Sequence, residues 1–473
     1  MDTVLYEFRT AIRTSNASLL ASTITPAPPA HDPGRLYAIL RSTNSYSIEA
    51  DVRYGLMQNN REISLTKARS AAWLDVYIAY YKVVVVLLDA EEKTNQGKLL
   101  EADWNRVYEA WKELVTTLIK GFNAGHFEGW TTPCLYVAVR CLREFAIKAD
   151  EANTRTKGAI TFNSGLQDDV VGALDKNDKL EDAARVINRI FGLCISDRAS
   201  LDESRKWGVY YITNMMFKTY FKLNSISLSK NILRSLNATA SDLPNFALFP
   251  KSHQVTFNYY VGVVSFLDED YTRAESHLAA AHRLCPAVPF AHKNRALILT
   301  YLIPCRLLTT HVLPTPSLLA PYPGLQQLFG PLSACVRRGD LAGFDAALVA
   351  GEADFVKRRI YLTLERGRDV AVRNLFRKVF LAGGFEPVKD GQGGEAERLR
   401  RTRIPLAEFA AAVRVGTRAD AREGGAGEGG LEQDEVECML ANLIYKNLMK
   451  GYISRAHGMV VLSKAGAFPG TGV

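Results

Sequence analysis

The sequence predicts a mostly α-helical protein with a short β-sheet near its C-terminus. Apolar residues recur at spacings of three and four along most of the chain, which is the pattern of helices that bury one face. One segment has the spacing of a paired helical repeat, and short strand-like segments appear only after residue 400. At 473 residues the chain is too long for one compact core, so we expect several structural units.

Residues 1–246 have the pattern of a helical-repeat region. After a proline-rich break at 25–34, apolar residues from Leu65 to Leu87 follow helical spacing, and a second apolar stripe begins at Trp104. The helices that we expect here cover 64–92, a segment that begins near 103, 133–152, 180–196 and 203–222. No run of alternating strands interrupts them, so this part is expected to be helical throughout.

Residues 258–286 carry the most specific repeat signal. Gly262 is followed at tetratricopeptide-like spacing by Ala274, Leu278, Ala281 and Pro286. Small residues let two antiparallel helices approach closely, the leucine fills the gap between them, and the proline ends the second helix. We therefore expect a tetratricopeptide-like, right-handed helical array, although one such match could also arise by chance in an alanine-rich helix.

Residues 247–384 continue as helices. An apolar helix is expected over 293–308, bent or broken at Pro304, followed by helices over 325–338 and 340–349. A long helix is expected over 359–384, ending at its two final glycines.

Residues 385–466 change character. A strand is expected to start at Ile404 and to lead into a helix that ends at Val415. A glycine-rich insert, 416–433, is expected to be flexible, and it precedes a last helix that ends before Gly451. Two short strands, 452–454 and 459–463, then form a hairpin, and 467–473 is a tail. Together with the long helix that precedes this segment, its two helices and the hairpin have the order that is typical of a winged helix.

Motifs for catalysis, metals or cofactors are missing from the sequence. The eight histidines show no ligand spacing, and no Cys-x-x-Cys pair, Gly-x-Ser-x-Gly elbow or Walker loop occurs. The stretch GAGEGG at 425–430 matches Gly-x-Gly-x-x-Gly, but it lies in the glycine-rich insert and not after a buried strand. We therefore expect no enzyme activity, no catalytic residues, no cofactor and no metal.

The charge distribution is uneven. The chain has 58 basic and 50 acidic residues, and the segment 357–403 alone has 13 basic and 6 acidic ones. Such a segment could attract phosphates or an acidic protein, or its charges could be balanced by neighbours in space. Seven scattered cysteines favour a reduced, intracellular protein. No signal peptide is evident, and the longest apolar block, 77–88, is too short for a membrane span, so we expect no membrane.

Basic residues of the predicted winged helix are candidates for phosphate contacts. Positive side chains at such places can meet on one surface and bind a nucleic-acid backbone without reading its sequence. Tyr445 and Tyr452 are the main candidates for stacking on bases. The basic candidates are Arg398, Arg400, Arg401, Arg403, Lys446, Lys450, Arg455 and Lys464.

The same module could instead bind a protein. Exposed strands can pair with a partner's sheet, and an adjacent apolar edge can be buried by that partner. The candidate interface residues are Gly451, Tyr452, Ile453, Ser454, Val460 and Leu462. A long helical array that ends in such a module is typical of scaffolds, so docking is the preferred interpretation and nucleic-acid binding comes second.

Several sequence blocks resemble a known family. The blocks are KNRALILTYLIPCRLL, RRGDLAGFDAAL, IYLTLERGRDVAVRNLFRKVF and VECMLANLIYKNLMKGYISRAHGMVVLSKAGAFP. They are similar to the PCI-domain family that contains COP signalosome subunit twelve, its human PCI-domain-containing relative and the PCI subunit of the nuclear transcription and mRNA-export complex. The resemblance covers roughly 250–469 and extends more loosely to the N-terminal helices. Its most specific parts are LANLIYKNLMKGYI and VVLSK-x(3)-FP.

The resemblance implies a non-catalytic scaffold subunit. It implies pairing with a second PCI-domain protein, winged helix beside winged helix, and binding of a small, acidic, disordered protein shared with the proteasome lid. It further implies a role in transcription-coupled mRNA processing or export in the nucleus, and possibly in the cytoplasm, with weak RNA or DNA binding. The insert at 416–433 departs from the family pattern. The alternative is a purely structural adaptor of a signalosome-like or translation-factor assembly, without nucleic-acid binding.

Overall fold

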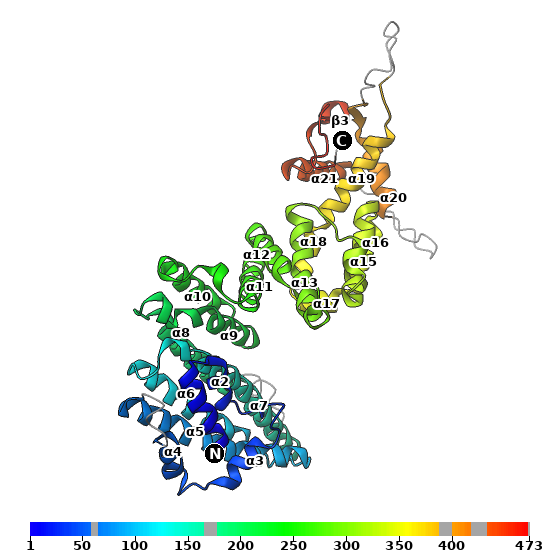
Figure 1. The fold of residues 1–473 in the computed structure, drawn as a ribbon. Helices are drawn as coiled ribbons and strands as arrows, with labels where there is room; N and C mark the ends of the chain where they lie inside the picture. Colours follow the sequence, from blue (N-terminus) through cyan, green and yellow to red (C-terminus); the bar gives the residue numbers. More distant parts are fainter. Residues whose placement is uncertain (58–64, 165–176, 387–399, 418–432, 472–473) are drawn as a thin grey trace. The chain divides into compact units, whose positions relative to one another are not determined.

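The computed structural model describes residues 1–57, 65–164, 177–386, 400–417 and 433–471. It is mostly helical, with a three-stranded antiparallel sheet near the C-terminus (Figure 1), which confirms the predicted fold class. The chain divides into two compact units, Met1–Tyr260 and Val261–Val473. The division at 246 and 384 that the sequence suggested stays a prediction, as does the handedness of the array.

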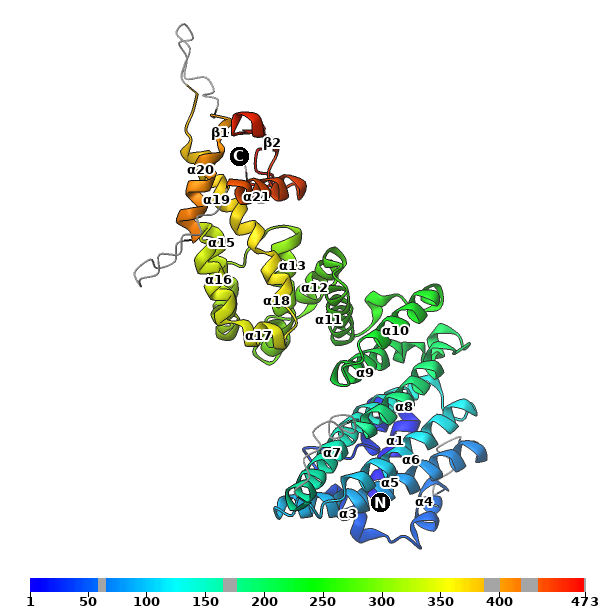
Figure 2. The ribbon, with the colours of Figure 1, turned by 180° about the vertical axis from the view of Figure 1, so that it is seen from behind.

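The first unit is built from helices alone in its described part. Three of them, α5, α6 and α7, lie side by side (Figures 1 and 2). The helices are α1 (Asp2–Thr14), α2 (Ala17–Thr23), α3 (Arg35–Ser42), α4 (Ile48–Met57), α5 (Lys67–Asn95), α6 (Trp104–Asn123), α7 (Pro133–Ser164), α8 (Asp178–Ile195), α9 (Val209–Lys222), α10 (Ser227–Ala238) and the start of α11 (Lys251–Leu267).

Aromatic side chains fill the centre of the first unit. Trp111 on α6 is fully buried, and its indole N–H donates to the carbonyl oxygen of Ala138 on α7 over 2.8 Å. Tyr77 on α5 is also fully buried, and its hydroxyl lies 2.8 Å from the Thr23 hydroxyl at the end of α2. A buried indole or phenol needs such a partner, because an unpaired polar group in the core is destabilising.

Helix α5 is longer than the apolar block on which the sequence expectation rested. With 29 residues it is long and apolar enough to cross a membrane by length and composition, so the short length of the block 77–88 does not by itself exclude a span. However, 67% of its most apolar window is buried inside the protein, as in the core helix of a globular unit. The absence of a membrane partner stays a prediction.

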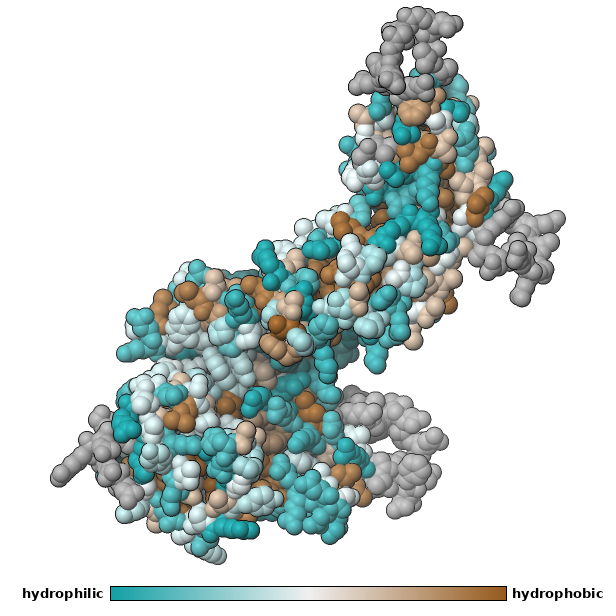
Figure 3. Space-filling view, turned by 45° about the vertical axis from the view of Figure 1, so that its right-hand side comes forward, coloured by the Kyte–Doolittle hydropathy of each residue, from teal (hydrophilic) through white to brown (hydrophobic). Residues whose placement is uncertain are grey.

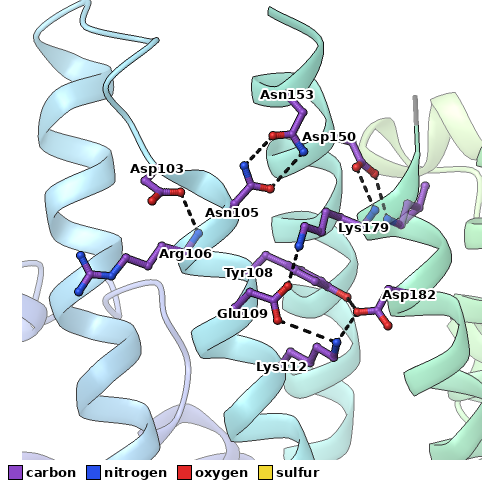
Figure 4. A network of polar contacts seen from close by, with 11 residues as sticks. Asp103, Asn105, Arg106, Tyr108, Glu109, Lys112, Asp150, Asn153, Lys179 and Asp182 are labelled. Atoms are coloured by element: carbon purple, nitrogen blue, oxygen red, sulfur yellow. Dashed lines mark hydrogen bonds and ion pairs between the residues drawn. The ribbon is translucent and has the colours of Figure 1, made fainter. Parts of the chain in front are cut away.

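Polar contacts tie α6 to α7 and α8 (Figure 4). Asp182 on α8 accepts hydrogen bonds from the Tyr108 hydroxyl over 2.7 Å and pairs with the Lys112 ammonium at 2.6 Å. Burial alone would raise the pKa of Asp182, but the hydrogen bonds from Lys112 and Tyr108 outweigh it and lower that pKa. On α7, Asp150 accepts from the backbone N–H groups of Lys179 and Leu180 and so caps the start of α8.

Asp197, just after α8, holds the start of the next segment. Its carboxylate accepts from the Ser204 hydroxyl over 2.9 Å, and from the Arg205 backbone N–H and guanidinium over 2.7 Å each. Burial would raise the pKa of Asp197, but these three donors lower it to about 2. The charged carboxylate therefore stabilises the 3-10 turn Arg205–Gly208 that leads into α9.

The second unit combines a helical part with the sheet. Its described helices after α11 are α12 (Tyr271–Leu284), α13 (His292–Thr309), α14 (Pro316–Leu319), α15 (Pro323–Arg338), α16 (Leu341–Ala350), α17 (Glu352–Lys357), α18 (Tyr361–Arg366), α19 (Arg368–Ala382), α20 (Leu406–Thr417) and α21 (Gln433–Tyr445). The strands are β1 (Arg403–Pro405), β2 (Gly451–Ser454) and β3 (Met459–Leu462).

The close helix approach predicted around Gly262 is confirmed. A Cβ atom at Gly262 would lie 2.6 Å from Cγ of Leu278 and 3.3 Å from the Ala274 carbonyl oxygen. Ala274 and Leu278 on α12 are fully buried. Only glycine therefore lets α11 and α12 pack at this distance.

The single long helix expected over 359–384 is wrong. The chain forms α18 and α19 instead, and they meet at Gly367. A side chain at Gly367 would lie 2.4 Å from Leu307 on α13, so the glycine allows α13 to pack tightly against the junction. In contrast, α13 continues through Pro304, where a bend or break was expected.

The winged helix has the predicted order of elements. Helices α19, α20 and α21 precede the β2–β3 hairpin, and β1 lies between α19 and α20 in the sequence. Phe376 of α19 packs edge-on against Phe409 of α20, with ring centroids 5.0 Å apart. Of the predicted insert 416–433, residues 416, 417 and 433 belong to helices, and 418–432 lie outside the described residues.

The visible surface mixes polar and apolar side chains. On the face drawn in Figure 3, hydrophobic residues occur singly or in small groups among hydrophilic ones. Exposed single hydrophobic residues are normal in folded proteins and do not mark a site by themselves.

We expect Gly262→Ala to destabilise the chain by about 1–3 kcal/mol, because the added methyl group forces Leu278 out of its place. Gly192→Ala on α8 is the matched control, since a Cβ there meets no atom within 4 Å. It should stabilise the helix by about 0.5–1 kcal/mol. Urea unfolding followed by circular dichroism measures both, and equal effects would contradict the close packing of α11 and α12.

We expect Asp197→Asn to lower the free energy of unfolding by about 2 kcal/mol at pH 7, because Arg205 loses its counter-charge. The folded pKa of Asp197 is depressed, so its contribution is complete above pH about 4 and is lost as the pH falls toward 2. The variant should therefore lose less stability than the wild type between pH 5 and pH 3. The exposed Asp202→Asn is the control, and unfolding curves with parallel pH dependence for all three proteins would disprove the assignment.

Candidate docking and nucleic-acid interface

Strand β2 forms one edge of the small sheet. The strand order is β1–β3–β2, and both pairings are antiparallel. One side of β2 pairs with β3, and no described strand pairs with its other side. Among the predicted interface residues, Tyr452 is 62% exposed, while Gly451, Ile453 and Ser454 are half-buried. An edge strand with an exposed aromatic side chain can accept a partner's strand or an apolar contact.

The other two interface candidates need correction, because Val460 and Leu462 are buried. They alternate with half-buried residues along β3, and their side chains are 0% and 3% exposed. Since β3 is the middle strand, its backbone is paired on both sides. These residues therefore belong to the core of the winged helix and do not offer a contact surface.

Three predicted basic residues meet at one end of the sheet. Arg403 at the start of β1 lies opposite Val461 of β3, and the N–H of Ser463 donates to the carbonyl oxygen of Lys450. Lys464 follows directly. All three cations, which we call the sheet-end cluster (Arg403, Lys450, Lys464), are exposed, and none pairs with a carboxylate in the described part of the chain. Unpaired, exposed cations in one place suit phosphate binding.

The remaining candidates of the 398–403 segment differ from one another. Arg398 lies outside the described residues. The Arg400 guanidinium lies 4.9 Å from the centre of the Phe385 ring, in a cation–π contact. Arg401 donates to the carbonyl oxygen of Arg403 over 3.1 Å and lies 3.7 Å from the Glu408 carboxylate. The positive charges of Arg400 and Arg401 thus already make contacts with other residues of the winged helix.

Lys446 and Arg455 are held by carboxylates of the chain itself. Lys446 at the end of α21 pairs with Asp369 of α19 at 2.5 Å. Arg455 in the hairpin turn lies 3.2 Å from Asp434 and 3.6 Å from Glu437, both on α21. The sequence did not reveal these acidic partners, because they lie between 18 and 77 residues away from the cations along the chain. Both cations therefore already have acidic partners within the chain.

The chain after β3 returns to the start of β2 and packs against α19. The N–H of Lys450 donates to the Ala467 carbonyl oxygen over 2.8 Å, and Phe468 is fully buried beside Phe380 of α19. The Arg373 guanidinium donates to the Pro469 carbonyl oxygen over 2.5 Å. These contacts attach the start of β2 to α19 and so fix the position of the sheet-end cluster.

The basic segment 357–403 is partly neutralised within the second unit. Arg366 pairs with Glu269 at 2.9 Å, and Arg368 pairs with Asp345 at 2.9 Å. One of the two interpretations of this segment was that neighbours in space balance its charges. This interpretation is correct for Arg366 and Arg368. Partly exposed pairs of this kind contribute at most about 1 kcal/mol each.

Among the described residues, no group of three or more His, Cys, Asp and Glu side chains could hold a metal ion. All seven cysteines are free, and five are buried, as expected for small core residues. Among exposed aromatic residues, Tyr445 (89%) and Tyr452 (62%) lie nearest in sequence to Lys450 of the sheet-end cluster.

Comparison with known proteins identifies the family. A model of the PCI domain matches residues 353–464, which include the whole winged helix. A protein of Neurospora crassa called "Protein CSN12 homolog" is 52% identical over 475 residues, and the alignment covers all of both chains. The chain belongs to the CSN12 family of PCI-domain proteins.

More distant relatives agree with this assignment. A Gibberella zeae protein with the same name is 50% identical, again over the full length of both chains. "PCI domain-containing protein 2" of Danio rerio is 32% identical over 78% of this chain and 80% of its own. Membership of the family supports a PCI-type scaffold subunit that associates with other PCI-complex subunits. The resemblance inferred from the sequence blocks is therefore confirmed.

Proposed function

We propose that this chain is a non-catalytic scaffold subunit of a nuclear PCI-protein complex. It pairs with a second PCI-domain protein, binds a small, acidic, disordered protein shared with the proteasome lid, and acts in transcription-coupled mRNA processing or export. The paired winged helices bind RNA or DNA through its backbone. The observation that carries this proposal is the free edge of β2, with exposed Tyr452, next to the unpaired cations of the sheet-end cluster.

The two neighbouring features suit two different tasks. The β2 edge offers backbone groups and an aromatic side chain to a protein, while Arg403, Lys450 and Lys464 offer positive charge without internal partners. A second winged helix placed beside β2 would lengthen the basic surface and so increase the number of phosphates in contact. Each winged helix alone would then bind nucleic acid weakly, and the pair would bind it better.

Docking is tested by co-expression with a second PCI-domain protein and the small acidic protein, followed by size-exclusion chromatography with light scattering. We expect one complex with all three chains, and a chain that elutes alone as a monomer would refute the proposal. Tyr452→Glu should weaken the pairing at least about tenfold. Tyr452 is exposed in the single chain, and a tyrosine that becomes buried in an interface is often a hot spot. Val415→Glu, at a residue that is 73% exposed on α20, is the matched control and should have no effect.

Nucleic-acid binding is tested by reversing the charges of the sheet-end cluster in the assembled complex. Replacing Arg403, Lys450 and Lys464 by Glu should weaken binding to duplex DNA and lower the slope of log affinity against log salt by about 2–3.

The control for this test is an equal charge reversal at Arg13, Lys67 and Lys98, which are exposed residues of the first unit. Filter binding at several salt concentrations measures both sets of variants. An unchanged slope in the sheet-end variant would place the nucleic-acid site elsewhere. No retention of any nucleic acid by the wild-type complex at low salt would favour the structural adaptor instead.

A further inference from the structure

One arginine joins three helices of the second unit. Arg295, in the first turn of α13, donates to the carbonyl oxygen of His282 over 3.2 Å and to that of Cys285, both at the end of α12. Its Nε donates over 3.2 Å to the hydroxyl of Tyr322, the residue that precedes α15. Arg295 forms no ion pair with a carboxylate in the described residues. Its charge is therefore stabilised by neutral acceptors.

The imidazole of His282 is one of these acceptors. Nη2 of Arg295 lies 2.9 Å from Nε2 of His282. A guanidinium keeps its protons and can only donate, so Nε2 of His282 must offer its lone pair. The one proton of the neutral ring then lies on Nδ1. This contact can form only while His282 is uncharged.

Two opposing effects act on the charge of His282. The ring lies in the last turn of α12, where the partial negative charge of a helix end normally favours a cation. However, Arg295 already occupies this place and donates to the carbonyl groups there. Burial and the positive charges of Arg295 and Arg306 lower the pKa of His282. The full charge of Arg295, in direct contact, outweighs the helix end.

No nearby carboxylate is available to stabilise a charged His282. Helices α13 and α15 contain no acidic residue. Glu275 of α12 already pairs with Arg306, with Oε1 and Nε 3.3 Å apart. Burial raises the pKa of the Cys285 thiol, which therefore stays neutral. The other ionisable groups here are Arg283, Tyr322 and His292, whose ring centre lies 4.9 Å from that of Tyr322.

The sign of the pH effect follows from these contacts. The pKa of His282 is lower in the folded chain than in the unfolded chain, where it is about 6.5. The open form of this region therefore binds more protons as the pH falls. The stabilisation is complete above pH about 7 and is lost as the pH falls below about 6.5. One histidine can change the opening equilibrium by at most about tenfold between pH 7.5 and pH 5.5.

We infer that the contact between His282 and Arg295 is a proton-sensitive joint of the second unit. A proton on His282 breaks the contact, repels Arg295 from the end of α12 and loosens the junction of α12, α13 and α15. His282 is half-buried, so solvent protons reach its ring. The joint also bears on the winged helix, because the Asn374 side chain of α19 donates to the Val336 carbonyl oxygen of α15 over 2.8 Å. The inference is independent of the proposed function, since it involves no partner.

The test follows backbone hydrogen exchange of the full chain by mass spectrometry at pH 7.5 and pH 5.5, with exchange times scaled to the intrinsic rate at each pH. In the wild type, protection of peptides from the end of α12 and the start of α13 should fall at least about threefold at the lower pH. His282→Gln offers an amide oxygen to Arg295 at both pH values, so its protection should stay constant. His31→Gln, at an exposed residue of the first unit, is the matched control and should behave like the wild type.

A permanent positive charge should have the effect of the proton. His282→Lys should lower protection at pH 7.5 to the value that the wild type has at pH 5.5. Peptides from α5 and α6 should keep their protection in all variants, which distinguishes a local opening from general unfolding in acid. Equal loss of protection in the wild type and in His282→Gln would overturn the inference. Wild-type protection in His282→Lys at pH 7.5 would overturn it as well.

Discussion

The middle position of β3 in the three-stranded sheet determines how the C-terminal part of this protein is arranged. Because β3 pairs with β1 on one side and with β2 on the other, its alternate side chains Val460 and Leu462 must fill the core between sheet and helices. The same order leaves β2 at an edge and brings the starts of β1 and β2 to one end of the sheet. Both the free edge and the cluster of cations follow from this single arrangement.

Local spacing predicted the helices well, and it predicted contacts between neighbouring helices best. Gly262, Ala274 and Leu278 lie on adjacent helices, so their spacing contained the information that determines their packing. The break at Gly367 was missed because its cause, the approach of Leu307, lies sixty residues earlier in the chain. Burial of Val460 and Leu462 was missed for a similar reason, since β1 has only three residues and gives no strand pattern of its own.

Charge was harder to predict than packing. The sequence showed where basic residues are numerous, but not which of them have acidic neighbours in space. Lys446 pairs with a carboxylate of α19 and Arg455 with carboxylates of α21, whereas Arg403, Lys450 and Lys464 form no ion pair in the described residues.

The pairing of β1 with β3 has a further consequence for how the chain reaches its fold. Ile404 must find Val460, about 56 residues later, whereas α11 and α12 meet through residues close in sequence. Contacts between distant residues require closure of a large loop and slow the search for the native state. During synthesis the helical array can therefore assemble as it leaves the ribosome, while the β2 edge and the sheet-end cluster form only after the last strand has emerged. Incomplete chains would thus lack both features.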